Sequence, residues 1–264
     1  MTTSNGLLAG KSGLVIGIAN ERSYAWHISK SLLDGGAKVA FTHLPGERNE
    51  HRTKRAIDAL GVSNPWLKPM DAGKDEDIHS VFEQYAAAHE RLDFVIHSIA
   101  FAERDLLQVG KFITTPRPQY LSAIDVSAYT LLAFARAAQP QMSKTGGSIL
   151  GMSYYGAEKV VPGYNIMGVA KACLECTARY LASEMGKDGI RVNIISGGYL
   201  RTLASSAVGG TGTMEDEVEK RAPLRRNVEG GDVGGTAAFL VSDLSRGITG
   251  ETIYVDCGVN ILGA

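Results

Sequence analysis

The feature that most constrains the fold is a strand–helix–strand unit near the start of the chain. Residues 12–18, SGLVIGI, are mostly apolar and predict a buried strand, and Ser23 is placed to cap a helix over 23–33. Two glycines end that helix, and residues 37–42 predict a second strand. A helix that joins two neighbouring strands in this way is typical of a parallel sheet with a right-handed crossover.

The same alternation continues to the end of the chain. Further strands are predicted at 66–70, 92–97, 147–152, 190–195 and 252–256, and further helices at 47–60, 75–89, 121–139, 163–185, 214–220 and 232–242. We therefore predict an α/β fold: a single doubly wound, Rossmann-type domain over 1–264, with a parallel sheet and helices on both faces. The helix at 121–139 is apolar around most of its circumference, so we expect the sheet and another subunit to cover it.

Composition excludes several functions. The 27 basic and 28 acidic residues give a net charge of -1, which favours neither nucleic-acid binding nor membrane binding. The N-terminus has no secretory signal pattern, and apolar runs look far shorter than the roughly 20 residues that cross a bilayer, so we expect a cytoplasmic protein. Three cysteines do not make a disulfide framework. Cys173 and Cys176 form a lone CxxC within a helix, which predicts small buried residues and no metal site.

The turn after the first strand is a candidate phosphate site, although it lacks the usual G-x-G-x-x-G spacing. Gly17 is its only glycine, and Ser23 opens the following helix. A pyrophosphate can bind the free N–H groups of a helix N-terminus and the Ser23 hydroxyl. An ordinary strand–turn–helix explains the same residues almost as well.

The ends of the next strands line up at one edge of a parallel sheet, where ligands bind in such folds. The second strand runs into His43 and Leu44 with no carboxylate for a ribose, and His43 and Arg48 either accept a 2′-phosphate or are solvated loop residues. The residues alone therefore leave NADH and NADPH open. Asp71 follows the third strand and can accept hydrogen bonds from adenine, and Ser98-Ile99-Ala100 follows the fourth.

Tyr164 and Lys171 are seven residues apart. On one helix, that spacing is about 700° of rotation and roughly 10 Å of rise, so the phenol and the ammonium would share a face. A phenol can donate a hydrogen bond to a developing oxyanion, and a nearby cation favours negative charge on that oxygen. The alternative for the pair alone is a core aromatic and a solvated lysine.

Taken together, these motifs resemble one family over nearly the whole chain. They are Tyr164-x6-Lys171, the flanking Ser153-Tyr154, the Gly17…Ser23 turn, residues 98–102 (SIAFA), residues 201–204 (RTLA) and the tail Gly250…Val255-Asp256. The chain resembles bacterial NADH-dependent enoyl-acyl-carrier-protein reductases of type I, which belong to the short-chain dehydrogenase superfamily. The six-residue gap is specific, because ordinary short-chain dehydrogenases use Tyr-x3-Lys.

The resemblance implies reduction of the trans-2 double bond of an enoyl thioester on acyl carrier protein, in fatty acid biosynthesis. It implies a homotetramer and NADH as cofactor, with NADPH less favoured. Tyr154, Tyr164 and Lys171 would be catalytic. Ala102, Tyr154 and Tyr164 would contact the substrate, and a loop around 198–213 would cover it. The cofactor would be bound by Gly17, Ser23, Tyr24, Leu44, Asp71, Ala72, Ser98, Ile99, Ala100, Lys171, Gly198, Leu200, Thr202 and Ala204.

Several positions depart from the family pattern, among them the unusually polar Asn20-Glu21-Arg22 in the first turn, and two other functions stay open. Leu44 stands where the family often has glutamine, Tyr199 replaces a usual proline, and His27 replaces a common glycine. A carbonyl reductase of the broader short-chain class would need tyrosine four residues before Lys171, where Met167 stands. A non-catalytic dinucleotide-binding sensor is the second alternative, and the departures at Asn20, Leu44 and Tyr199 are its support.

Overall fold

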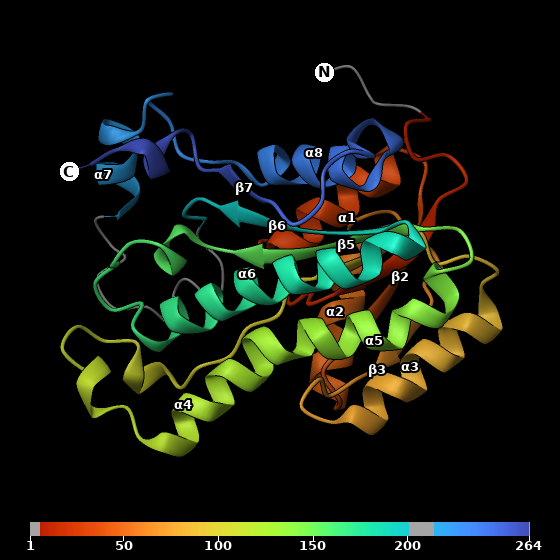
Figure 1. Cartoon of the computed structure of the whole chain (residues 1–264), viewed down its shortest axis with the longest axis horizontal. Helices are drawn as coiled ribbons and strands as arrows, with labels where there is room; N and C mark the ends of the chain where they lie inside the picture. Colours follow the sequence, from red (N-terminus) through yellow and green to blue (C-terminus); the bar gives the residue numbers. More distant parts are fainter. Residues whose placement is uncertain (1–5, 201–213, 264) are drawn as a thin grey trace.

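The computed structural model describes residues 6–200 and 214–263, and its core is a sheet of seven parallel strands (Figure 1). The strand order is β3-β2-β1-β4-β5-β6-β7. The strands are β1 Ser12–Ile16, β2 Lys38–His43, β3 Leu67–Pro69, β4 Phe94–His97, β5 Gly147–Ser153, β6 Ile190–Gly197 and β7 Thr252–Val255. The predicted parallel, doubly wound fold is therefore confirmed, with each strand within a few residues of its expected place.

Helices cover both faces of the sheet (Figure 1). They are α1 Tyr24–Asp34, α2 Glu47–Asp58, α3 Asp75–Ala88, α4 Arg117–Ile124, α5 Thr130–Met142, α6 Ile166–Met185, α7 Met214–Arg221 and α8 Gly230–Val241. One apolar core lies between the sheet and α1, α2 and α8, and a second lies between the sheet and α3, α5 and α6. Burial on both faces explains why the central strands are apolar without alternation.

Local signals in the sequence explain the first unit. All five residues of β1 are buried, as expected for a central parallel strand. Ser23 caps α1 by accepting a hydrogen bond from the backbone N–H of Trp26. Gly35 is the C-cap, and Gly36 follows at a φ of 91°, a left-handed conformation that glycine adopts readily.

The apolar helix predicted at 121–139 is longer and less regular than expected. α4 and α5 are joined by a π-helical segment, Asp125–Tyr129, so that Arg117–Met142 runs as one 26-residue stretch. By length and composition this stretch passes for a membrane-crossing helix, so the expectation that apolar runs are far too short was wrong. Half of the residues in its most apolar 18-residue segment are buried within the fold, and its Arg136 forms an ion pair with Asp75 of α3 at 3.3 Å. Its apolar character suits a helix that packs against the sheet and its neighbours.

The second departure concerns Tyr164. The predicted helix at 163–185 begins only at Ile166, and its N-cap, Asn165, has a φ of 48°. Tyr164 therefore lies in the turn ahead of α6 and not on the helix with Lys171. The substrate-covering loop expected at 198–213 lies outside the described residues beyond Leu200, and so do Thr202 and Ala204.

Candidate active site

A cavity of about 710 Å³ opens at the carboxyl edge of the strands. It lies over the point where the sheet order reverses, with β1 and β4 side by side, which is where ligands bind in doubly wound folds. Its volume is within the roughly 300–1,000 Å³ that small-molecule and cofactor sites occupy. Residues that follow β1 through β6 all contribute to its wall.

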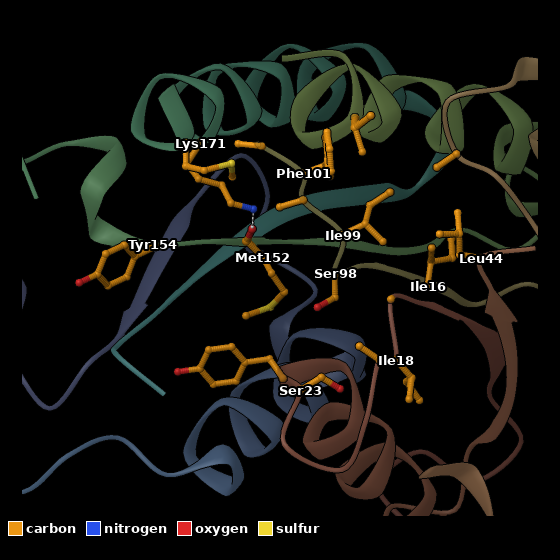
Figure 2. Close-up of a pocket in the computed structure, with 18 of the residues that line it drawn as sticks. Ile16, Ile18, Ser23, Leu44, Ser98, Ile99, Phe101, Met152, Tyr154 and Lys171 are labelled. Atoms are coloured by element: carbon orange, nitrogen blue, oxygen red, sulfur yellow. Dashed lines mark hydrogen bonds between the residues drawn. The ribbon is translucent and has the colours of Figure 1, made fainter. Parts of the chain in front are cut away.

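The structure brings the predicted site residues together around this cavity (Figure 2). Its wall includes Gly17, Ser23, Tyr24, Leu44, Asp71, Ala72, Ser98, Ile99, Ala100, Ala102, Tyr154, Tyr164, Lys171, Gly198 and Leu200. Two ends can be distinguished. We call the part formed by Met152, Tyr154, Tyr164 and Lys171 the Lys171 end, and the part formed by His43, Leu44, Asn49 and Arg52 the Leu44 end.

The first turn supplies the middle of the wall, between the two ends. Gly17 has a φ of 113°, and a Cβ on it would collide with the backbone carbonyl of Ser98. Only glycine lets β1 and the segment after β4 approach so closely. The Ser23 hydroxyl donates to the Asn20 carbonyl at 2.7 Å and accepts from the N–H of Trp26, so it already has internal partners. The turn between Gly17 and Ser23 therefore places the N-terminus of α1 at the cavity wall, and its shape depends on a glycine at position 17.

Lys171 is the central charged group of its end. Its side chain is buried, and Nζ donates a hydrogen bond to the Met152 carbonyl at 2.7 Å (Figure 2). Burial lowers the pKa of Lys171 to about 8, and the nearby Glu175 acts in the opposite direction. A lysine near this value changes charge close to neutral pH, which is common at functional sites.

Two tyrosines stand beside this lysine. The rings of Tyr154 and Tyr164 meet edge to face, 5.1 Å between centroids. Burial raises the pKa of both phenols well above the ordinary value, so both are protonated at neutral pH and can donate. Tyr164 is held by the turn ahead of α6, because Asn165 Nδ2 donates to the carbonyls of Leu106 and Gln108, each at 2.7 Å.

His97, at the end of β4, is a neighbour that the sequence did not single out. It is fully buried, and its Nε2 lies 2.7 Å from the Thr130 hydroxyl. Burial, together with the charge of Lys171, lowers the pKa of His97 to about 3. His97 is therefore neutral and adds no second positive charge next to Lys171.

The Leu44 end is open and differently built. Leu44 is 57% exposed, and His43 Nδ1 is 3.0 Å from the Leu44 carbonyl. Arg48, one of the two residues suggested for a 2′-phosphate, is exposed and is not part of the cavity wall, so its contact with a phosphate stays a prediction. Arg52, one turn further along α2, lines the cavity instead, and its Nη2 donates to Asn49 Oδ1 at 3.2 Å.

Sequence reasoning missed part of the wall. The missed residues include Asn20, Thr42, Asn49, Arg52, Phe101, Leu107, Ser122, Val126, Met152, Val161 and Met167. Asn49 and Arg52 were detectable in principle, because positions three apart on a helix share a face. The apolar members carry no such signal, since they look like any core residue.

The structure also places the residues that depart from the family pattern, and the two cysteines of the CxxC. Tyr199 lines the cavity close to Gly198, whose carbonyl accepts a hydrogen bond from the Tyr24 hydroxyl at 2.7 Å. His27 packs on Gly230, where any side chain would collide with the imidazole ring. The CxxC cysteines lie on α6 as predicted, but Cys173 is half-buried and Cys176 is exposed, so the expectation that both are buried was wrong.

Sheet order, cavity position and first turn define the chain as a dinucleotide-binding α/β protein of the oxidoreductase type. A family model described as Enoyl-(Acyl carrier protein) reductase matches residues 17–260. The chain belongs to the enoyl-(acyl carrier protein) reductase family. It is 49% identical over 257 residues to the NADH-dependent enoyl-acyl-carrier-protein reductase FabI of Nostoc sp., covering 97% of this chain and 98% of that relative.

Solved structures agree with this assignment. The Bacillus cereus enoyl-acyl carrier protein reductase, determined with NADP+ and indole naphthyridinone, has a TM-score of 0.94 at 46% identity and covers 98% of this chain and 99% of its own. The Anaplasma phagocytophilum reductase in complex with NAD has a TM-score of 0.92 at 44% identity, covering 98% and 97%. The likeness extends over the entire cavity-forming sheet.

Proposed function

We propose that this protein reduces the trans-2 double bond of enoyl thioesters carried by acyl carrier protein, using NADH, as a step of fatty acid biosynthesis. The observation that carries the proposal is the convergence of Tyr164, Tyr154 and the anchored Lys171 at one end of a dinucleotide-sized cavity. A carbonyl reductase is not favoured, because Met167 lies where that chemistry needs a tyrosine.

The residues present fit a dinucleotide. The cavity runs without interruption from Leu44 to Lys171, and the glycine turn at Gly17 leaves room for a backbone-bound pyrophosphate next to α1. Leu44 and Asp71 would contact the adenosine, Ser98-Ile99-Ala100 the middle, and Lys171 the nicotinamide ribose hydroxyls. The nicotinamide, when bound, supplies the hydride for C3 of the substrate.

Tyr164 and Lys171 divide the remaining work. Hydride addition to a conjugated thioester puts negative charge on the thioester oxygen. Tyr164 is a protonated phenol with a raised pKa, so it stabilises that oxygen by donating a hydrogen bond. Lys171 adds positive potential and, through its bond to the Met152 carbonyl, has a fixed position. Tyr154 and Ala102 shape the acyl pocket.

The experiment that tests the function follows absorbance at 340 nm with crotonyl or longer enoyl thioesters, on carrier protein and on coenzyme A, with NADH and with NADPH. We expect loss of NADH absorbance and a preference for carrier-protein thioesters. The proposal fails if neither nucleotide is oxidised with any enoyl thioester. Nucleotide binding without turnover would instead favour the non-catalytic sensor.

We also propose a cytoplasmic homotetramer. Several apolar side chains on the outer faces of α5, α6 and the π segment are exposed in the single chain, among them Tyr129, Leu132 and Tyr180, the last at 71%. Exposed apolar side chains gathered on neighbouring helices are typical of subunit interfaces. Light scattering tests the assembly: we expect four times the mass of one chain, and a monomer would contradict it.

A further inference from the structure

A carboxylate behind the Lys171 end has no role in the chemistry above. Glu175 lies on α6, four residues after Lys171, so the two side chains leave the same face of the helix about 6 Å apart along its axis. Glu175 does not line the cavity and is only partly exposed. A partly buried carboxylate next to an active-site cation calls for an explanation.

The two side chains are fixed to consecutive residues of the same strand. Lys171 Nζ donates to the Met152 carbonyl at 2.7 Å, and the Ser153 hydroxyl donates to Glu175 Oε1 at 2.5 Å. Ser153 is itself buried at the end of β5. The strand therefore holds the ammonium and the carboxylate in a set relation, and a short bond from a hydroxyl favours the ionised carboxylate.

The surroundings make Glu175 the balancing charge for Lys171. Burial lowers the pKa of Lys171, and Glu175 is the opposing influence. Burial also raises the pKa of Glu175, and the Ser153 hydrogen bond and Lys171 act in the opposite direction. In the described part of the chain, the uncharged titratable groups around the pair are His97 of β4, Tyr154, Tyr164 and Tyr254 of β7. The charged groups are Arg179 on α6 and Glu158, which follows the 3-10 turn Tyr155–Ala157 and accepts a hydrogen bond from Tyr254. Arg179 favours the ionised form of Glu175, and Glu158 opposes it.

We propose that Glu175 is a positioning residue that keeps Lys171 charged while the enzyme works, and that Ser153 fixes the carboxylate for this purpose. The inference rests on the proposed function, because the charge of Lys171 matters to turnover only if Lys171 serves the reacting oxygen and the cofactor ribose. Lys171 loses its positive charge as the pH rises through its pKa, so activity falls on the alkaline side. Removal of the Glu175 charge moves that fall to lower pH.

The first test is a pH profile of kcat/KM between about pH 6 and pH 10. We expect Glu175→Gln to move the alkaline limb down by about one pH unit, since a nearby opposite charge typically shifts a pKa by about one unit or more. Ser153→Ala keeps the Glu175 carboxylate but removes the hydrogen bond that holds it, so the alkaline limb should move in the same direction by a smaller amount. Glu184→Gln removes the same charge from the exposed far end of α6 and should leave the limb in place.

The second test reads Lys171 without any turnover. Protein labelled with carbon-13 at the lysine ε-carbon is titrated by NMR, and the Lys171 resonance is the one missing from Lys171→Met. Its titration midpoint should fall by about one unit in Glu175→Gln and by less in Ser153→Ala.

The outcomes separate cleanly. An unchanged Lys171 midpoint in Glu175→Gln overturns the inference, and if that variant does not fold, an unchanged midpoint in Ser153→Ala does so. Failure of the wild type to reduce any enoyl thioester would overturn the proposed function, while the NMR midpoints would still decide whether Glu175 holds the charge.

Discussion

The two ends of the cavity are built on different principles. At the Lys171 end, Lys171 is buried and Tyr154 and Tyr164 are half-buried, the pKa values of all three are displaced, and the lysine donates a hydrogen bond to β5. At the Leu44 end, the wall is formed by a 57%-exposed leucine and by Asn49 and Arg52 on α2. The first end holds a desolvated charge, and the second meets the solvent at Leu44.

This difference indicates where the sequence can vary at little cost. Electrostatic interactions are much stronger in a desolvated site than in water, so small changes at the Lys171 end should have large effects. At the Leu44 end, water can replace a lost contact, which agrees with a departure from the family pattern occurring at Leu44. Four substitutions test the contrast, beginning at the buried end.

The largest effect is expected from Lys171→Ala. It removes the cation that serves both the ribose hydroxyls and the reacting oxygen, so kcat/KM should fall by about 1,000-fold or more. The dissociation constant for NADH, measured by fluorescence titration, should rise as well. Normal affinity for NADH in a folded variant would contradict the assigned role.

Tyr164→Phe should have the next largest effect. It keeps the ring and its packing on Tyr154 but removes one donor to the developing oxyanion, which is typically worth about 100-fold in kcat. Because the phenol acts on the substrate, NADH affinity should stay within about twofold of the wild type. Steady-state kinetics and a binding titration on the same preparation separate the two. A kcat close to the wild type would remove Tyr164 from the mechanism.

Gly17→Ala tests the turn between the two ends. The added methyl group collides with the Ser98 carbonyl at a backbone conformation that alanine rarely adopts, so the chain must shift. We expect about a tenfold loss of NADH affinity and a lower free energy of unfolding, by about 1–3 kcal/mol. Gly6→Ala, also at positive φ but with nothing nearby, is the matched control for backbone strain alone. Equal losses in the two variants would argue against a crowded turn.

The smallest effect is expected at the Leu44 end. Arg52→Gln should lower kcat/KM for NADPH by about threefold to tenfold and change that for NADH by less, since a guanidinium near the ribose favours a 2′-phosphate. Arg48→Gln is the matched control, because it removes the same charge from the same helix outside the cavity wall. Equal changes for the two nucleotides, or in the two variants, would show that Arg52 does not read the phosphate.

Much of the fold was predictable because its signals are local. Buried parallel strands are short apolar runs, and caps such as Ser23 and glycines such as Gly36 mark helix ends. The π segment at Asp125–Tyr129 was not predictable, because it contains no proline or glycine and arises from packing in the assembled fold.

The candidate site was predictable where strand ends converge. Gly17, Asp71 and Ser98 follow strands, and a parallel sheet brings such positions to one edge. The helical interpretation of Tyr164 was wrong because Gly163 and Asn165 both take positive φ and delay the start of α6. Arg52 was missed because helical spacing shows that it shares a face with Asn49, but only the packing of α2 beside β2 shows that this face lines the cavity.

The order of strands has a consequence for the synthesis of the protein. β1 pairs with β2 on one side and with β4 on the other, and β4 begins at Phe94, about 50 residues after β2 ends. At about 5–20 residues per second, the ribosome needs roughly 3–10 s to make that segment. For those seconds the nascent chain holds an apolar strand with one open edge, a template for wrong pairing. This interval comes before Tyr164 and Lys171 have been synthesised.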